Sequence, residues 1–143
     1  MDNGFTKKEL KMVGAALYSC EGTRLRRDKR RVNNVYHWVI EFTNADPKLI
    51  KLFLLFMRKV LLIHEQKLKG QLFIYKDLNE GKVEKFWSRV TKIPLSRFNK
   101  TIILIPRGYK GKLSDRGTFK LRYHSKETFQ KLDNIMRKVF QKV

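Results

Sequence analysis

One glutamate in this sequence follows a run of small residues and stands at the end of a predicted helix. Glu21 is followed by Gly22, and glycine at that place is typical of a helix that ends in a left-handed residue. A carboxylate at such an end can ligate a divalent metal ion, or it can simply be solvated. These residues alone leave both interpretations open.

The residues before Glu21 are small at positions that share a helical face. Residues three or four apart in a helix lie side by side, so a second helix can approach this face closely. The small residues are Gly14, Ala15, Ala16 and Cys20. Packing in an ordinary core is the alternative explanation for them.

Residues 14–22 resemble the LAGLIDADG motif of homing endonucleases, with Glu21 and Gly22 matching its closing Asp-Gly. Further segments are similar to the short, single-motif proteins of this family, so the resemblance spans roughly residues 5–140. These segments are 39–47, 86–87, 93–98 and 117–125. Glutamate replaces the usual aspartate of the motif, and Ser19 occupies its more variable aspartate position.

The resemblance implies a homodimer, because single-motif proteins resemble one half of the enzyme and pair through the motif helices. It implies that Glu21 of each chain and the backbone carbonyl of Cys20 ligate Mg²⁺ (or Mn²⁺) between the scissile phosphates. Divalent metals commonly supply the nucleophile and the charge neutralisation that phosphodiester cleavage needs. The expected dimer interface consists of Gly14, Ala15, Ala16, Ser19 and Cys20.

The charge balance indicates a polyanionic partner. The chain has 33 Lys and Arg against 13 Asp and Glu, which gives a formal net charge of +20. Basic residues occur in predicted strands as well as helices, which is unlike a basic amphipathic membrane anchor. We therefore expect nucleic acid and not a membrane as the partner. Charge alone does not separate double-stranded DNA from RNA.

Length and composition indicate one soluble domain. The 143 residues, 42% of them apolar, suffice for one domain with a real core, so we treat 1–143 as a single LAGLIDADG-type domain. The lone Cys20 fits a reducing cytoplasm, and the three histidines lack zinc-site spacing. The apolar run 49–57 is shorter than the ~20 residues of a membrane-spanning helix. We expect an intracellular, cytoplasmic protein.

The order of predicted elements indicates an α+β fold. A capping box of Thr6 and Glu9 begins the first helix, and alternating residues mark a strand over 35–43. The expected helices are 7–21, 47–59, 79–90 and one after Ser125, and the further strands are 67–76, 101–105 and 118–124. This order resembles the homing-endonuclease fold, an antiparallel, saddle-shaped sheet with helices packed on one face.

If the apolar residues of each strand face the helices, the alternate positions face outward. A sheet can enter a major groove about 12 Å wide, where Arg and Lys pair with guanine edges and Gln can read adenine. A solvated face is the alternative, but the set is strongly biased toward basic residues. The expected DNA-binding residues are Arg24, Arg26, Arg30, His37, Lys69, Gln71, Lys120, Arg122 and His124.

Three functions compete on the sequence. The first is a homodimeric, Mg²⁺-dependent, site-specific endonuclease of homing type that hydrolyses double-stranded DNA. The second is a catalytically inactive DNA-binding regulator, and the third is an RNA-binding intron maturase with the same fold. Glu21 favours the first over the second, because a pure binder needs no carboxylate directed at phosphates. Nothing in the sequence separates endonuclease from maturase.

Overall fold

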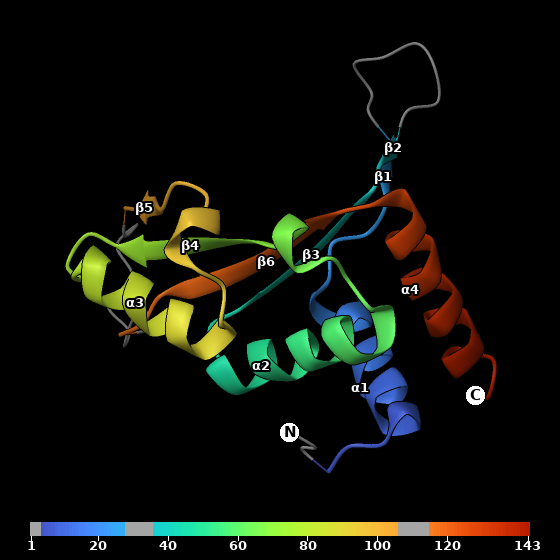
Figure 1. The fold of residues 1–143 in the computed structure, drawn as a ribbon. Helices are drawn as coiled ribbons and strands as arrows, with labels where there is room; N and C mark the ends of the chain where they lie inside the picture. Colours follow the sequence, from blue (N-terminus) through green and yellow to red (C-terminus); the bar gives the residue numbers. More distant parts are fainter. Residues whose placement is uncertain (1–3, 28–35, 106–114) are drawn as a thin grey trace.

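The computed structural model describes residues 4–27, 36–105 and 115–143, and it confirms the α+β class. Figure 1 shows four α-helices of these residues on one side of a sheet. Short helical turns follow α2 and precede β4 and β5. The helices are α1 (Lys7–Glu21), α2 (Pro47–Phe56), α3 (Glu80–Thr91) and α4 (Lys126–Phe140), with turns at Met57–Leu61, Glu65–Lys67 and Leu95–Arg97.

The main sheet has four strands in the order β3–β6–β4–β5, and it is mixed. Its strands are β3 (Val39–Asn44), β4 (Lys69–Tyr75), β5 (Ile102–Leu104) and β6 (Thr118–His124). Strand β6 pairs antiparallel with β3 and β4, but β5 runs parallel to β4. The expectation of a wholly antiparallel sheet is therefore wrong. The connection through α3 returns the chain to the end of the sheet at which β4 begins, so β5 can run parallel to β4.

The core lies between the sheet and the helices, and it is rich in aromatic side chains. Phe42 on β3 stacks on Phe53 of α2 at 4.4 Å between ring centroids. At the other end of the sheet, Trp87 of α3 stacks on Phe119 of β6 at 5.0 Å. All four rings are fully buried. The expected inward face of β6 is thereby confirmed.

Helix α1 begins and ends as a result of specific local contacts. At its start, the side chain of Thr6 accepts from the amide of Glu9 at 3.1 Å, and the Glu9 carboxylate accepts from the amide of Thr6 at 2.9 Å. These hydrogen bonds to Thr6 hold the pKa of Glu9 below its usual value. The expected capping box and the expected bounds of this helix are confirmed.

The end of α1 differs from the left-handed stop expected at Gly22. Gly22 has φ −82° and ψ 151°, which is extended backbone. It bridges to Phe42, and the amide of Thr23 donates to the carbonyl of Glu41 at 3.0 Å, so the chain leaves the helix alongside β3. Glycine is needed here because a Cβ would collide with the ring of Tyr18. The reason for Gly22 is thus close packing and not a positive φ.

The strand expected over 35–43 is divided at Trp38. Residues Tyr36–His37 form β2, which pairs antiparallel with β1 (Arg26–Arg27), and β3 begins at Val39. Figure 1 shows this β1–β2 ribbon extending away from the main sheet. Tyr36 follows the alternation of the buried face of β3 but is 39% exposed, because the ribbon lies beyond the helices. No helix in the described part of the chain is long and apolar enough to cross a membrane.

Candidate nucleic-acid interface

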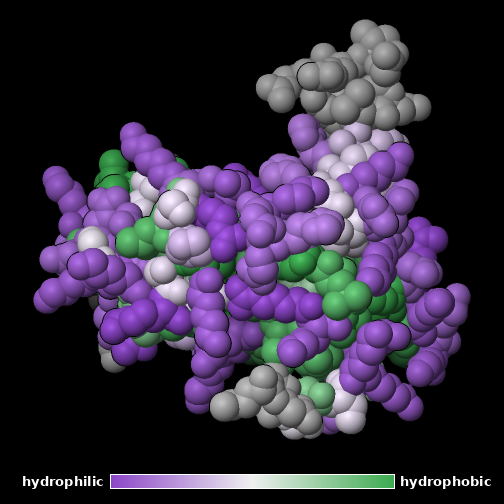
Figure 2. Space-filling model, viewed as in Figure 1, coloured by the Kyte–Doolittle hydropathy of each residue, from purple (hydrophilic) through white to green (hydrophobic). Residues whose placement is uncertain are grey.

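The face of the sheet opposite the helices carries a continuous set of polar and basic side chains. Along β6, the side chains of Lys120, Arg122 and His124 alternate with buried Phe119, Leu121 and Tyr123, as the strand period requires. We call the outward side of β3, β6 and β4 the open face. Figure 2 shows mainly hydrophilic side chains above the sheet in this view.

Strand register brings the outward residues of two neighbouring strands side by side. Lys69 of β4 lies opposite Arg122, and Gln71 lies opposite Lys120. Directly opposite residues on one face are close neighbours in an antiparallel pair. The expected DNA-binding residues that share the open face are therefore Lys69, Gln71, Lys120, Arg122 and His124.

The side chain of Gln71 makes one hydrogen bond within the chain. Its side-chain nitrogen donates to the carbonyl of Lys100 at 2.9 Å. The contact fixes the orientation of the amide and leaves its oxygen and one N–H as hydrogen-bonding groups. Bidentate contact with adenine uses one donor and one acceptor of the amide, so this side chain keeps the groups that such a contact requires.

Glu41 of β3 lies buried beneath two cations of the open face. The Nε and Nη2 atoms of Arg122 donate to its Oε2 atom at 3.1 and 2.9 Å, and Nζ of Lys120 lies 3.5 Å from the same oxygen. Glu41 is 3% exposed. Burial alone would raise the pKa of Glu41, but hydrogen bonding and charge from Arg122 and Lys120 outweigh it and lower that pKa. Glu41 is thus an ionised carboxylate, and its negative charge is balanced by Arg122 and Lys120.

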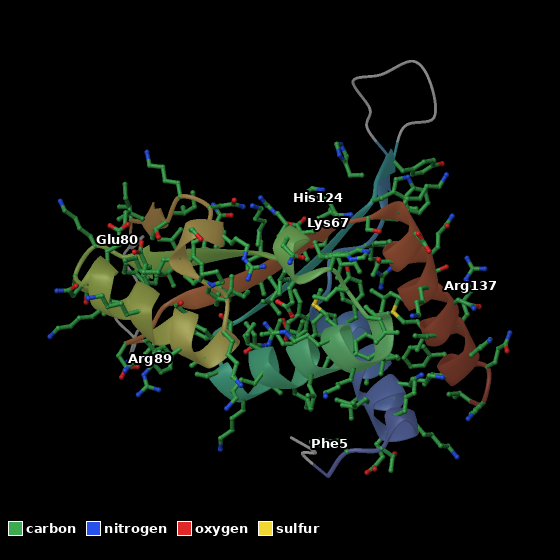
Figure 3. The ribbon with its side chains drawn as sticks, viewed as in Figure 1. Phe5, Lys67, Glu80, Arg89, His124 and Arg137 are labelled. Atoms are coloured by element: carbon green, nitrogen blue, oxygen red, sulfur yellow. The ribbon has the colours of Figure 1, made fainter. Side chains whose placement is uncertain are left out.

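His124 is the last residue of β6 and lies at the end of the open face that is next to the β1–β2 ribbon. Desolvation of the ring and the positive charge of Arg122 lower the pKa of His124, against an opposing attraction from Glu41. The charges of His37 and Lys67 act in the same lowering direction. Figure 3 shows Lys67 beside His124 on the side of the sheet away from α2. At neutral pH the His124 ring is consequently uncharged and able to donate and accept one hydrogen bond each.

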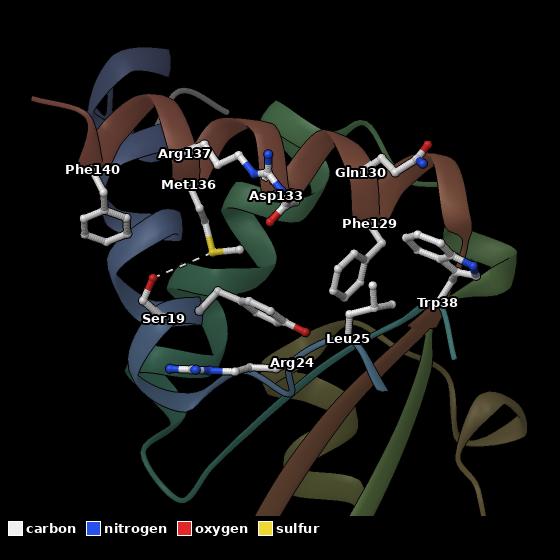
Figure 4. Close-up of a pocket in the computed structure, with 11 residues that line it drawn as sticks. Ser19, Arg24, Leu25, Trp38, Phe129, Gln130, Asp133, Met136, Arg137 and Phe140 are labelled. Carbon is white, nitrogen blue, oxygen red and sulfur yellow. Dashed lines mark hydrogen bonds and ion pairs between the residues drawn. The ribbon is translucent and has the colours of Figure 1, made fainter. Parts of the chain in front are cut away.

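The remaining expected DNA contacts differ in their places in the structure. Arg24 lines a pocket of about 710 Å³ between α1 and α4, where Figure 4 shows it below Ser19. Phe129, Met136 and Phe140 of α4 line the same pocket, so Arg24 lies on the helical side and its assignment to the outward face is wrong. His37 is exposed on the ribbon. Arg26 lies opposite His37 in the ribbon register, and Arg30 lies outside the described residues.

The structure divides the expected dimer interface between the core and the surface. Ala15 is fully buried, and Gly14 is buried against the ring of Phe56 on α2, where an added Cβ would collide. Packing in the core of one chain, the alternative explanation for the small residues, therefore holds for these two. The partner of Gly14 is α2. The residues of the expected interface that remain exposed are Ala16, Ser19 and Cys20.

Glu21 lies exposed at the end of α1, next to the segment that runs beside β3. The last amide that continues the helix ladder is that of Gly22, which donates to the carbonyl of Tyr18 at 2.8 Å. The carbonyl of Cys20 lies beyond this last bond, where helices leave oxygens without an intrahelical donor. Carboxylate and carbonyl oxygens are the donors that Mg²⁺ prefers.

The surroundings of Glu21 can be compared with the metal site that the resemblance implies. Among the residues that the structure describes, no three His, Cys, Asp or Glu side chains gather into a group that could hold a metal ion. The oxygen donors of Glu21 and Cys20 fit half of a site that a second copy would complete, as the resemblance implies.

Glu41 is a functional residue that the sequence analysis missed. The sequence did contain a signal for its role: Glu41 is an acid at a strand position, and other strands of the sheet carry basic residues. A charged group that is buried in a sheet needs a partner of opposite charge. Comparison of the chain with protein-family models, with curated proteins and with solved structures finds no match.

Proposed function

We propose that this protein binds double-stranded DNA through the open face and cleaves it, as a homodimer with a divalent metal ion, in the manner of a homing endonuclease. The observation that carries the proposal is the open face itself. Its outward side chains include Lys69, Lys120 and Arg122, while Glu41, the acid beneath them, is buried and paired. Such a face attracts phosphate and presents side chains that read base edges.

The arrangement of helices and strands supports the same proposal. The antiparallel core β3–β6–β4, with helices on one side, is compatible with the sheet of the homing-endonuclease fold. Helix α1 ends beside β3, so Glu21 lies at the boundary between the helical layer and the sheet. A bound metal would neutralise developing phosphate charge and activate water. Glu21 and the Cys20 carbonyl would hold that metal.

Pairing through α1 supplies the second carboxylate. Met12, Ala16 and Ser19 are three or four residues apart, so they share one exposed helical face. Met12 is 50% exposed and lines a groove between α1 and α4. A second α1 packed on this face would cover Met12 and bring two copies of Glu21 into one complex.

The proposal is tested by incubating the full chain with a randomised duplex library. Ca²⁺ serves as the binding-only metal, and Mg²⁺ as the metal for cleavage. We expect selection of specific duplexes in Ca²⁺ and double-strand cleavage of the same duplexes in Mg²⁺. Specific binding without cleavage in Mg²⁺ or Mn²⁺ would identify a DNA-binding regulator. A marked preference for structured RNA over duplex DNA would instead favour the maturase function.

A further inference from the structure

The geometry points to Glu41 as a positioning residue that presents Arg122 to a guanine edge of bound DNA. This inference rests on the DNA-binding function proposed above, and it adds the base that one residue of the open face reads. It starts from the way in which the two side chains meet. The contact uses one edge of the guanidinium group, and Nη1 on the other edge has no hydrogen-bond partner among the described residues.

A guanidinium group has two edges that can each make a pair of hydrogen bonds. The Nε and Nη2 atoms of Arg122 form one edge, and both donate to Oε2 of Glu41, at 3.1 and 2.9 Å. The second edge consists of Nη1 and the remaining N–H of Nη2. No acceptor for Nη1 occurs among the described residues. This second edge has the spacing that matches O6 and N7 of guanine.

Another arginine of the chain shows what a purely structural pair looks like. Arg58 donates to Glu65 through Nε and Nη2, and Nη2 also donates to the carbonyl of Thr91 at 2.8 Å. One of the two nitrogens of its second edge is therefore already used inside the protein. Arg122 differs, because only its inner edge is used, and its side chain is 30% exposed on a face of basic residues.

Holding the arginine in advance increases its power to discriminate. A free arginine loses side-chain entropy when it binds, and a pre-oriented one loses less. Glu41 is 3% exposed and so does not itself reach the DNA. Lys120 also contacts Glu41, but an ammonium group lacks the planar fork and acts as a point charge. Arg122 is thus the guanine-reading group, and Glu41 orients it.

The test measures base preference and not only affinity. The wild-type chain is used to select duplexes from a randomised library in Ca²⁺, and binding is then compared for the selected duplex and for versions with each guanine replaced. We expect Glu41→Gln to lose the preference for guanine at one position, by about five- to 150-fold, which is the range of one bidentate contact. Affinity for unrelated duplexes should stay equal or rise, since a negative charge is removed.

A double-mutant cycle separates positioning from general electrostatics. Arg122→Lys keeps the positive charge but lacks the planar guanidinium group, so it should lose the same guanine preference. Adding Glu41→Gln to this variant should cause no further loss. Glu65→Gln is the matched control, because it breaks an acid–arginine pair whose arginine is used within the protein. If Glu41→Gln fails to fold, Glu41→Asp replaces it, and its shorter carboxylate should weaken the same preference.

The outcomes separate this inference from the function on which it rests. Retention of the full guanine preference in Glu41→Gln, or independent losses in the two single variants, would overturn the inference and leave DNA binding intact. Selection of duplexes without any guanine preference would also overturn it. Failure of the wild-type chain to bind duplex DNA would overturn both proposals together.

Discussion

The hydroxyl of Tyr18 connects the last turn of α1 to the strand that carries Glu41. It donates to the carbonyl of Thr23, and it lies 3.4 Å from the backbone amide of Glu41, from which it accepts. The Tyr18 ring is buried and stacks on Phe53 of α2. One side chain therefore links the helix end at Glu21, the helical core and the inner support of the open face.

Removing this hydroxyl tests the link. We expect Tyr18→Phe to lower the free energy of unfolding by about 1–2 kcal/mol, because the Thr23 carbonyl and the Glu41 amide lose a buried partner. Urea denaturation measures the change. Tyr75→Phe is the control, since the Tyr75 hydroxyl makes no hydrogen bond within the described residues. An equal effect of the two substitutions would show that the hydroxyl of Tyr18 does not hold these segments together.

Two substitutions on α1 should have different consequences although they are two residues apart. Ala16→Leu adds bulk on the exposed face, so it should weaken dimerisation by about 1–3 kcal/mol and leave the folding of each chain unchanged. Gly14→Ala should instead lower the stability of each chain, because the new Cβ meets the ring of Phe56. Sedimentation with duplex DNA and urea denaturation separate the two effects. A dimer that is unaffected by Ala16→Leu would place the interface elsewhere.

Local sequence patterns predicted the elements well because their causes are local. The bounds of α1 and β6 follow from a capping box and from strict alternation, and both are confirmed. Asp46 and Ser125 likewise cap α2 and α4, which begin where the sequence predicted. Each of these signals acts within a few residues, so it can be evaluated without the rest of the fold.

Relations between elements were harder to predict, because the sequence does not say which faces meet. Small residues indicated that α1 is closely packed, but only the fold shows that Gly14 meets Phe56 of its own chain. The helix predicted between two strands was a sign of the parallel β4–β5 pair, since parallel strands need such a crossover. Arg24 was misplaced because its position depends on how α1 and α4 form the pocket that it lines.

The salt dependence of DNA binding should reveal which cations contact phosphate. We expect Lys69→Met to reduce the slope of log affinity against log salt by about 0.9, the value for one phosphate contact on duplex DNA. Lys8→Met is the charge-matched control, because Lys8 lines a groove between α1 and α4 and not the open face. Equal slopes for the two variants would mean that the open face is not the principal contact with DNA.

Acid should destabilise the protein partly through Glu41. The folded-state pKa of Glu41 is lowered from the ordinary value of 4.5, so the pair stabilises the fold above that pH. This contribution falls as the pH drops through the folded-state pKa, because the unfolded chain takes up the proton more readily. Glu41→Gln should flatten the loss of unfolding free energy below about pH 4.5, measured by urea titration at several pH values. An unchanged acid limb would contradict the assignment of Glu41 as an ionised, paired carboxylate.

The decisive substitution for the proposed activity is Glu21→Gln. It keeps the shape of the side chain at the exposed end of α1 and removes the charge that would hold a metal ion. Binding of the selected duplex in Ca²⁺-free buffer should persist or tighten, because two carboxylates near phosphates repel DNA. Cleavage in Mg²⁺ should disappear. Glu9→Gln at the other end of α1 is the control, since that carboxylate only caps the helix. Undiminished cleavage by Glu21→Gln would remove Glu21 from the chemistry, and the metal would then have to be held by other oxygens.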